Sequence, residues 1–305
     1  MADADRDASA ETREREQAES LARIESGRIP LQAERRLQEM ATSGAPFSST
    51  LSVDEFALCS KLGLQPLGQV LGASVHQVGW QNLPWSASWG GGLICELDVI
   101  AGAWEEARRR AFDRLAEEAS HLKADVVVGV RLHRGAHDWA AGAVDYVVNG
   151  TAARLPGSDR PGRPLLSDLS GQELWLLHQA GYAPVGLVAA TAVFFVSPSY
   201  STQWARYMTS SVNQELTEFT QGVYAARESA LGSLTGQANA NGADGIVGVR
   251  IEQETAFHSF SVGSAIGGRG DRQGLIVTLQ AFGTAIRQRE RADQSPARAA
   301  IELGR

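Results

Sequence analysis

The sequence is poor in cysteine and has no excess of positive charge. Its two cysteines, Cys59 and Cys95, are too few for a disulfide framework, so we expect two reduced thiols in a cytoplasmic protein. The formal net charge of −7 argues against a nucleic-acid-binding protein, because such proteins normally present a basic face. The first residues are acidic and no apolar stretch follows them, so we expect no signal peptide.

Long apolar runs and catalytic motifs are also missing. The longest nearly apolar run, 187–196, is too short to cross a bilayer, and it is better interpreted as a buried strand. The glycines at 90–92 precede a helical pattern, but they lack the Lys and Ser/Thr of a phosphate-binding loop. No Ser-His-Asp order is present either. The sequence therefore predicts that the protein is not an enzyme, and it identifies no particular cofactor.

The sequence does contain an internal repeat, in which one unit occurs twice. Three pairs of segments align without gaps: 52–68 with 170–186, 124–131 with 243–250, and 150–152 with 283–285. The shared positions are mostly glycine, proline, alanine and aliphatic residues, which determine backbone geometry and packing. They are not the residues of acid, base or metal chemistry. The repeat therefore predicts an architecture and says little about a reaction.

Each repeat has the same expected order of elements. Ser52 and Glu55 form a capping box that predicts a short helix, and Ser170 and Glu173 form a second one. A strand follows, and then apolar residues recur at helical spacing over 97–122, with a matching helix in the second repeat. Two more strands complete the unit. The expected fold class is α+β, with two β-α-β-β repeats, each a small antiparallel sheet with one long helix.

The next strand of each repeat is interrupted by glycine at the same place, Gly129 and Gly248, which indicates a bulge or a close backbone approach. The expected organisation has four parts: a helical, charged N-terminal arm over 1–46, a first repeat over 47–156, a second repeat over 157–288 and a flexible C-terminal tail over 289–305. The arm is either a solvated helix or a module that docks on a protein partner or on its own assembly.

The order of these motifs resembles the YbjQ-like family. The resemblance consists of Pro-Leu-Gly at 66–68 before the long helix, Ala-Asp-Val-Val-Val-Gly-Val at 124–130, and a strand that ends in Gly-Thr-Ala at 150–152. That family carries the label "putative heavy-metal-binding domain". The resemblance implies a dodecin-like fold whose units associate into a closed five-membered ring, in which each open sheet is covered by its neighbour. This chain resembles a tandem version.

The tandem repeat constrains the stoichiometry that the resemblance implies. Five is odd, whereas this chain supplies units in twos, and homo-oligomers normally have closed symmetry. We therefore predict a homo-oligomer of five chains that forms two stacked five-membered rings. The alternative is one ring with an even number of units, for example from three chains. The expected function is that of a non-enzymatic, ring-forming scaffold or binding protein without a membrane span. The alternative is a stress protein that binds a metal or a small planar ligand between subunits.

The candidate metal ligands are few. His133 and His137 have the spacing that binds a metal on a helix, although here they follow a strand and flank a glycine. Cys59 and Cys95 are the only thiols, and they lack the paired spacing of a structural zinc site. The alternatives are a solvated loop for the histidines and buried, inert thiols for the cysteines.

Three tryptophans, Trp80, Trp85 and Trp89, lie in one predicted loop of the first repeat. Aromatic side chains at such a place either cover the core or line a pocket for a planar ligand. The second interpretation is suggested by the dodecins, which bind flavins between subunits. The sequence leaves both interpretations open.

Two charged positions recur in both repeats. Asp125 and Asp244 stand at the turn from the long helix into the next strand, and Arg131 and Arg250 stand near the end of that strand. The aspartates are either turn residues that accept backbone N–H bonds or partners of the arginines across a subunit boundary. These four residues are the candidate interface positions.

Overall fold

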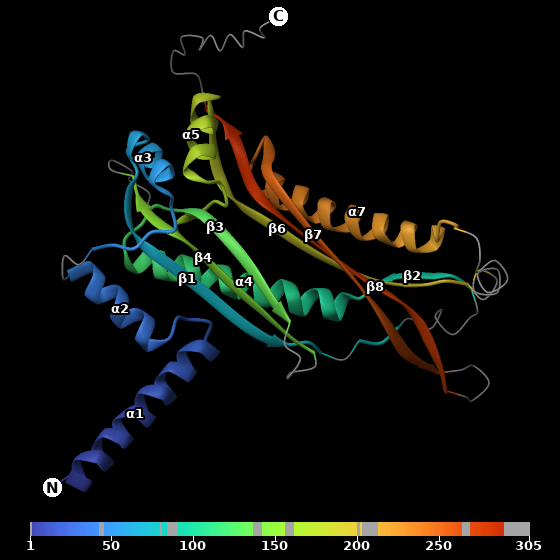
Figure 1. Cartoon of the computed structure of the whole chain (residues 1–305), viewed down its shortest axis with the longest axis horizontal. Coiled ribbons are helices and arrows are strands. Elements are labelled where there is room, and N and C mark those ends of the chain that lie inside the picture. The colour runs from blue at the N-terminus through green and yellow to red at the C-terminus, as the bar shows by residue number, and fades with distance from the viewer. Residues whose placement is uncertain are drawn as a thin grey trace, which may run out of the picture.

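Two four-stranded sheets, each carrying one long helix, form the body of the protein in a computed structural model (Figure 1). The structure describes residues 2–42, 46–79, 81–83, 91–136, 142–155, 162–199, 202, 213–263 and 269–289. The first sheet has the order β1-β4-β3-β5 and the second has the order β2-β6-β8-β7. The predicted fold class, α+β with two β-α-β-β repeats, is confirmed, whereas the boundaries of the four predicted parts stay a prediction.

The first repeat and the elements before it occupy the N-terminal half of the chain. In order they are α1 (Ala2–Glu25), α2 (Leu31–Thr42), α3 (Val53–Lys61), β1 (Gln65–Gln77), β2 (Leu93–Glu96), α4 (Asp98–His121), β3 (Val126–Ala136) and β4 (Ala143–Arg154). The second repeat follows with β5 (Leu165–Leu166), α5 (Gly171–Gln179), β6 (Tyr182–Ser197), α7 (Thr217–Ala240), β7 (Gly245–Gly263) and β8 (Arg269–Gln288). No helix among the described segments is long and apolar enough to cross a membrane.

The short helices α3 and α5 begin where the sequence predicts. Both capping boxes are formed: the Ser52 hydroxyl accepts from the Glu55 amide at 3.3 Å, and the Ser170 hydroxyl accepts from the Glu173 amide at 3.2 Å. Each pair satisfies two amides that would otherwise lack a partner at a helix start. The two helices therefore begin with the same cap in both repeats.

The glycines inside β3 and β7 mark bulges. Gly129 has φ of 64° and Gly248 has φ of 67°, a left-handed conformation that favours glycine. The register of β3 with β4 and of β7 with β8 shifts at these residues. A bulge bends the strand and turns its edge. The same bend thus occurs at the same place in both repeats.

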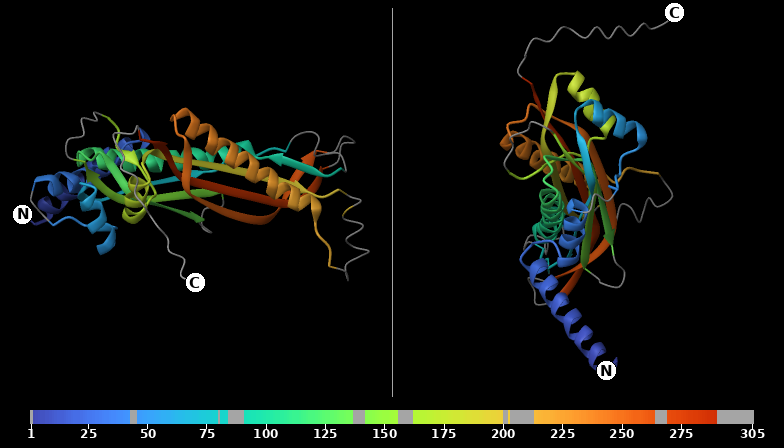
Figure 2. Two further views of the ribbon diagram at one scale, coloured as in Figure 1. Left: turned by 90° about the horizontal axis from the view of Figure 1, so that it is seen from above. Right: turned by 90° about the vertical axis from the view of Figure 1, so that its left-hand side faces the viewer.

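The long helices α4 and α7 lie on the same side of the strands (Figure 2). Each presents alanines to its sheet, Ala107 and Ala111 from α4 and Ala226 and Ala230 from α7, all of which are buried. Small side chains let a helix approach a sheet closely. The approach is closest at Gly72 of β1, where an added Cβ would strike the α4 backbone.

The N-terminal arm packs on the first repeat through α2, while α1 projects away from the sheets (Figure 1). The side chains of Ile29 and Leu37 are fully buried in the core that contains α4 and β1. The helix α1 is held to α2 by polar contacts, among them the ion pair of Arg23 with Glu34 and that of Arg35 with Glu16. The arm is therefore docked at α2 and extended at α1.

Candidate functional site

The candidate site is the contact between the two repeats. The segment 165–169, which precedes α5, adds to the edge of β3 in the first sheet, and its first two residues form the parallel strand β5. The amide of Leu165 donates to the Asp125 carbonyl at 3.0 Å, and the amide of Ser167 donates to the Val127 carbonyl at 3.0 Å. An edge strand with open hydrogen-bonding groups is thus covered by the next repeat.

The bulge of β3 completes this contact. Gly129 donates to the Leu169 carbonyl at 3.0 Å, and Val130 donates to the Ser167 carbonyl at 2.9 Å. Arg131 donates from its guanidinium to the Asp168 carbonyl at 3.1 Å. Two amides of the bulge and the Arg131 guanidinium therefore donate to the backbone oxygens of residues 167–169.

A buried polar cluster holds the other side of the same segment to its own sheet. The Thr284 hydroxyl of β8 donates to the Asp168 carboxylate at 2.5 Å and contacts the Ser167 hydroxyl at 3.1 Å. The amide of Asp168 donates to the same Thr284 oxygen at 3.1 Å. Burial raises the pKa of Asp168, and the Thr284 hydrogen bond acts against that rise. The segment is thus fixed from both sides.

The first repeat also reaches across to β6. The short strand β2 pairs with β6 in antiparallel register. On α4, the guanidinium of Arg108 is almost completely buried and donates to the Ala189 carbonyl at 2.8 Å and to the Thr191 hydroxyl at 2.6 Å. A buried guanidinium needs such partners because its desolvation is costly. Arg108 therefore ties the helix of one repeat to the strand of the other.

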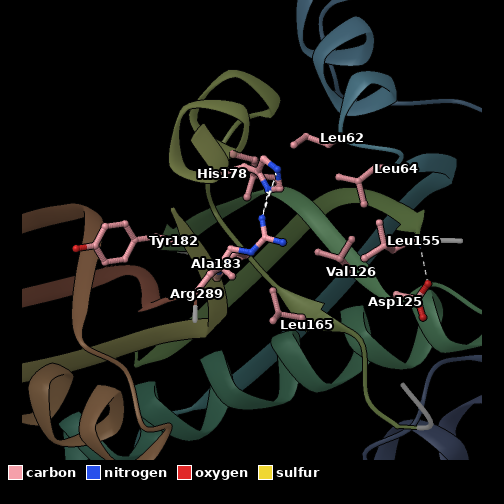
Figure 3. Close-up of a pocket in the computed structure, with 12 residues that line it drawn as sticks. Leu62, Leu64, Asp125, Val126, Leu155, Leu165, His178, Tyr182, Ala183 and Arg289 are labelled. Carbon is pink, nitrogen blue, oxygen red and sulfur yellow. Dashed lines mark hydrogen bonds between the residues drawn. The ribbon is translucent and has the colours of Figure 1, made fainter. Parts of the chain in front are cut away.

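A groove opens at the junction, next to the covered edge (Figure 3). Its volume is about 450 Å³ and its walls come from both repeats. The lining residues are Leu62, Leu64, Asp125, Val126, Leu155, Leu165, Leu174, His178, Tyr182, Ala183, Pro184 and Arg289. Arg289 approaches His178, with 2.7 Å between Nη1 and Nδ1. Burial, and then the Arg289 charge, lower the pKa of His178, so the imidazole is neutral near pH 7.

The predicted metal ligands do not form a site among the described residues. Cys59 is buried between α3 and α5, Cys95 lies on β2, and His133 is exposed on β3, whereas His137 lies outside the described residues. Burial raises the pKa of each thiol to about 11, so neither is a thiolate near pH 7. No group of three His, Cys, Asp or Glu side chains that could hold a metal occurs in the described ranges. The metal site therefore stays a prediction, since His137 is not among the described residues.

The aromatic pocket that the sequence suggests cannot be placed. Trp80, Trp85 and Trp89 all lie outside the described residues. The proposal of a planar ligand there stays a prediction.

The four charged candidates take two different positions. The Asp125 carboxylate accepts from the Leu155 amide and the Asp244 carboxylate accepts from the Gln288 amide, each at 2.7 Å and within its own repeat. All four residues lie in described segments, and neither aspartate forms an ion pair with Arg131 or Arg250 there. Arg131 binds a carbonyl of the other repeat, and the Arg250 guanidinium lies over the Phe282 ring.

A buried carboxylate joins the arm to α4. Glu118 accepts from the Arg36 guanidinium and from the Leu71 amide, each at 2.8 Å. Burial raises the pKa of Glu118, and these two donors act against that rise. In the second repeat, Gln237 accepts from the Ala189 amide in the same arrangement. The two repeats thus use a charged and a neutral acceptor for one role.

Replacing this carboxylate by its neutral counterpart, Glu118→Gln, is expected to change the pH dependence of stability. Because the pKa of Glu118 is higher in the folded state, that state binds more protons between the unfolded and folded pKa values. Wild-type stability therefore falls as pH rises through that window, which starts at about 4.3, and the variant lacks this loss. Denaturation at pH 4 and pH 7 should show that the free energy of unfolding of the variant, relative to that of wild type, is higher at pH 7 than at pH 4.

The reciprocal substitution, Gln237→Glu, is the matched control. It introduces a half-buried carboxylate without an arginine from the arm, so its free energy of unfolding should fall relative to wild type as the pH rises. An unchanged difference between Glu118→Gln and wild type at the two pH values would contradict the argument.

Sequence reasoning missed the segments that make the junction. The gapless alignment at Ser52 and Ser170 extends five residues upstream, so that Phe47-Ser-Ser-Thr-Leu51 stands opposite Leu165-Leu-Ser-Asp-Leu169. The shared serine and leucine were the available signal. The strands β2 and β5 were missed because four and two residues carry no periodicity.

Comparison with known proteins identifies a family and a relative that the chain resembles. The family described as "Putative heavy-metal-binding" (YbjQ) matches residues 91–156 and 183–288, within both repeats. The chain is also 37% identical over 210 residues to a protein of Mycobacterium tuberculosis named "Encapsulin nanocompartment protein Rv1762c". That alignment covers 67% of this chain and 77% of the relative. No solved structure matches the chain at a significant level.

Proposed function

Because this chain belongs to the YbjQ family and carries its unit twice, we propose that it is a non-enzymatic scaffold that assembles with copies of itself into a ring. The observation that carries this proposal is the contact between the repeats. It is heterologous: the β3 edge of one repeat receives a different surface, residues 165–169, from the next. A contact of this kind joins units in a series, which closes into a ring when the rotation between units permits it.

The similarity to the mycobacterial relative supports an assembly role. The name of that relative associates it with an encapsulin nanocompartment, and the shared region includes most of both chains. An identity of 37% over 210 residues implies a common fold. The similarity therefore agrees with a structural role better than with catalysis.

The described residues do not favour the alternative of a metal-binding protein. They bring together no group of three ligands, and both thiols have a raised pKa. A planar ligand would depend on tryptophans outside the described residues. The partner of the N-terminal arm also stays a prediction, for which the projecting helix α1 is the available surface.

The proposal is tested by the mass of the native protein. We expect one discrete species at a multiple of the 32.6 kDa chain mass in mass photometry and in sedimentation velocity. The double ring predicts five chains, whereas the single ring with an even number of units allows three. A chain that sediments as a monomer across micromolar concentrations would refute the scaffold.

A further inference from the structure

We propose that the contact between the repeats is used a second time, between copies of this chain. In this arrangement the β7 edge of one copy receives residues 47–51 of the next copy. The proposal rests on the proposed assembly and adds the surfaces that make it. It follows from a comparison of equivalent positions, which are buried where the repeats meet and exposed at the two ends of the chain.

The segment 47–51 has the conformation that this contact needs. The Ser49 hydroxyl contacts the Thr151 hydroxyl at 3.2 Å, and the Thr50 amide donates to the same oxygen at 3.0 Å. Ser167 and Asp168 make the equivalent contacts with Thr284. The segment is therefore fixed to its own sheet in the same way, and no hydrogen bond among the described residues joins it to the second repeat.

The β7 edge is the matching acceptor. It has the same bulge as β3, at Gly248, and the same residue before the recurrent arginine. That residue is Val130 in the first repeat, with 1% of its surface exposed, and Val249 in the second, with 40% exposed. The difference arises because segment 165–169 covers β3 and no described segment covers this part of β7.

The surfaces on the helix side show the same pattern. Arg108 is buried against β6, whereas its equivalent on α7, Arg227, is exposed. Val193 on β6 has 0% of its surface exposed, whereas its equivalent on β1, Val75, has 63% exposed. One end of the chain thus presents the exposed Arg227 of α7 and the β7 edge. The other end presents segment 47–51 and the exposed Val75 of β1, beside the part of β1 on which α2 packs.

The internal contact predicts the hydrogen bonds between copies. The amides of Phe47 and Ser49 would donate to the carbonyls of Asp244 and Ile246, as Leu165 and Ser167 do within the chain. Because each copy then contributes two consecutive units to one series, the ring contains both repeats in alternation and an even number of units. This geometry supports a single ring with an even number of units over two stacked five-membered rings.

One part of the internal contact cannot be copied. Gly171 lies against α3, where an added Cβ would be 2.6 Å from the Glu55 carbonyl oxygen. The equivalent residue of the first repeat is Val53, whose side chain is 85% exposed. The helix pair must therefore stand farther apart between copies, and the contact there depends on the strand addition and on Arg227.

The first test places a charge on the proposed edge with the variant Val249→Glu. Assembly would bury this carboxylate without a partner, so we expect the dissociation constant of the oligomer to rise about a hundredfold or more. The control is Phe257→Glu, which changes an exposed apolar residue farther along β7, outside the pairing stretch. Mass photometry at nanomolar concentrations should show the first variant dissociated and the control assembled. Equal masses for the two variants would overturn the proposal.

The second test is a disulfide between copies. In the internal contact Val126 pairs with Leu165, so Gly245 should pair with Phe47 of the next copy. A Cβ at Gly245 meets no atom nearer than 4.0 Å, and neighbouring strands have a Cα separation that suits a disulfide. We expect a mixture of the Phe47→Cys and Gly245→Cys chains to form a covalent dimer under oxidation.

The control mixture contains Phe47→Cys and Thr255→Cys, the latter being exposed on β7 beyond the pairing stretch. Of the natural thiols, Cys59 is buried and Cys95 is half-buried, both have pKa values raised to about 11, and both should react slowly. An oligomer of the expected mass with no Phe47–Gly245 cross-link would overturn this inference and leave the scaffold intact. A monomer in every measurement would refute both.

Discussion

The Gly72→Val variant is expected to lose about 3 kcal/mol or more of its free energy of unfolding, because the side chain would be forced into the backbone of α4. An added Cβ at Gly72 strikes the Ala111 carbonyl and lies 2.7 Å from the Leu115 amide nitrogen. Backbone atoms inside a helix cannot move aside as a flexible side chain can. The helix must therefore separate from the first sheet, which exposes the alanines of its buried face.

The second repeat provides the control for this prediction. Ala190 occupies the equivalent position on β6 with 1% of its surface exposed, so α7 tolerates a methyl group where α4 tolerates none. The Ala190→Gly variant should lose only about 1 kcal/mol, mainly from backbone entropy. Guanidinium chloride denaturation followed by circular dichroism measures both. Comparable losses in the two variants would contradict the close approach of α4.

The Gly171→Val variant is expected to open the contact between the repeats. Its Cβ would lie 2.6 Å from the Glu55 carbonyl oxygen and 2.9 Å from the Cys59 sulfur. We expect a loss of about 2–3 kcal/mol, typical of overpacking. The Cys59 thiol should also become reactive, because α5 no longer covers it.

Position 53 supplies the matched control, since Val53 is the equivalent residue and has 85% of its surface exposed. The Val53→Gly variant removes a side chain that contacts little, so its stability should change by less than about 1 kcal/mol. The rate at which a thiol reagent modifies Cys59 should rise only in Gly171→Val. If modification is equally slow in both variants, the helix pair does not close the junction.

Local features of the fold follow from the sequence because their causes are local. The capping boxes at Ser52 and Ser170 need only residues three positions apart. The bulges at Gly129 and Gly248 need a left-handed residue, which glycine supplies. The two long helices follow from apolar periodicity. Each of these predictions depends on neighbours within one or two turns of the chain, and each is present in the structure.

The junction could not be predicted in this way. The segments 93–96 and 165–166 are strands only because edges of β6 and β3 are beside them. The burial of Arg108 depends on β6, some 80 residues later in the chain, and its exposed equivalent Arg227 has the same place in the helix pattern. The spacing of His133, Cys59 and Cys95 in the sequence likewise does not predict that they lie on separate elements.

The sequence by itself determined the repeated β-α-β-β unit, its helix caps, its bulges and its membership of one family. Periodicity, capping and backbone conformation are properties of short stretches, and the duplication made each of them visible twice. Only the tertiary structure decided which copy of each surface is covered. Edge pairing and burial depend on contacts between residues far apart in the chain. The two similar repeats therefore have different neighbours, because one lies toward each end of the chain.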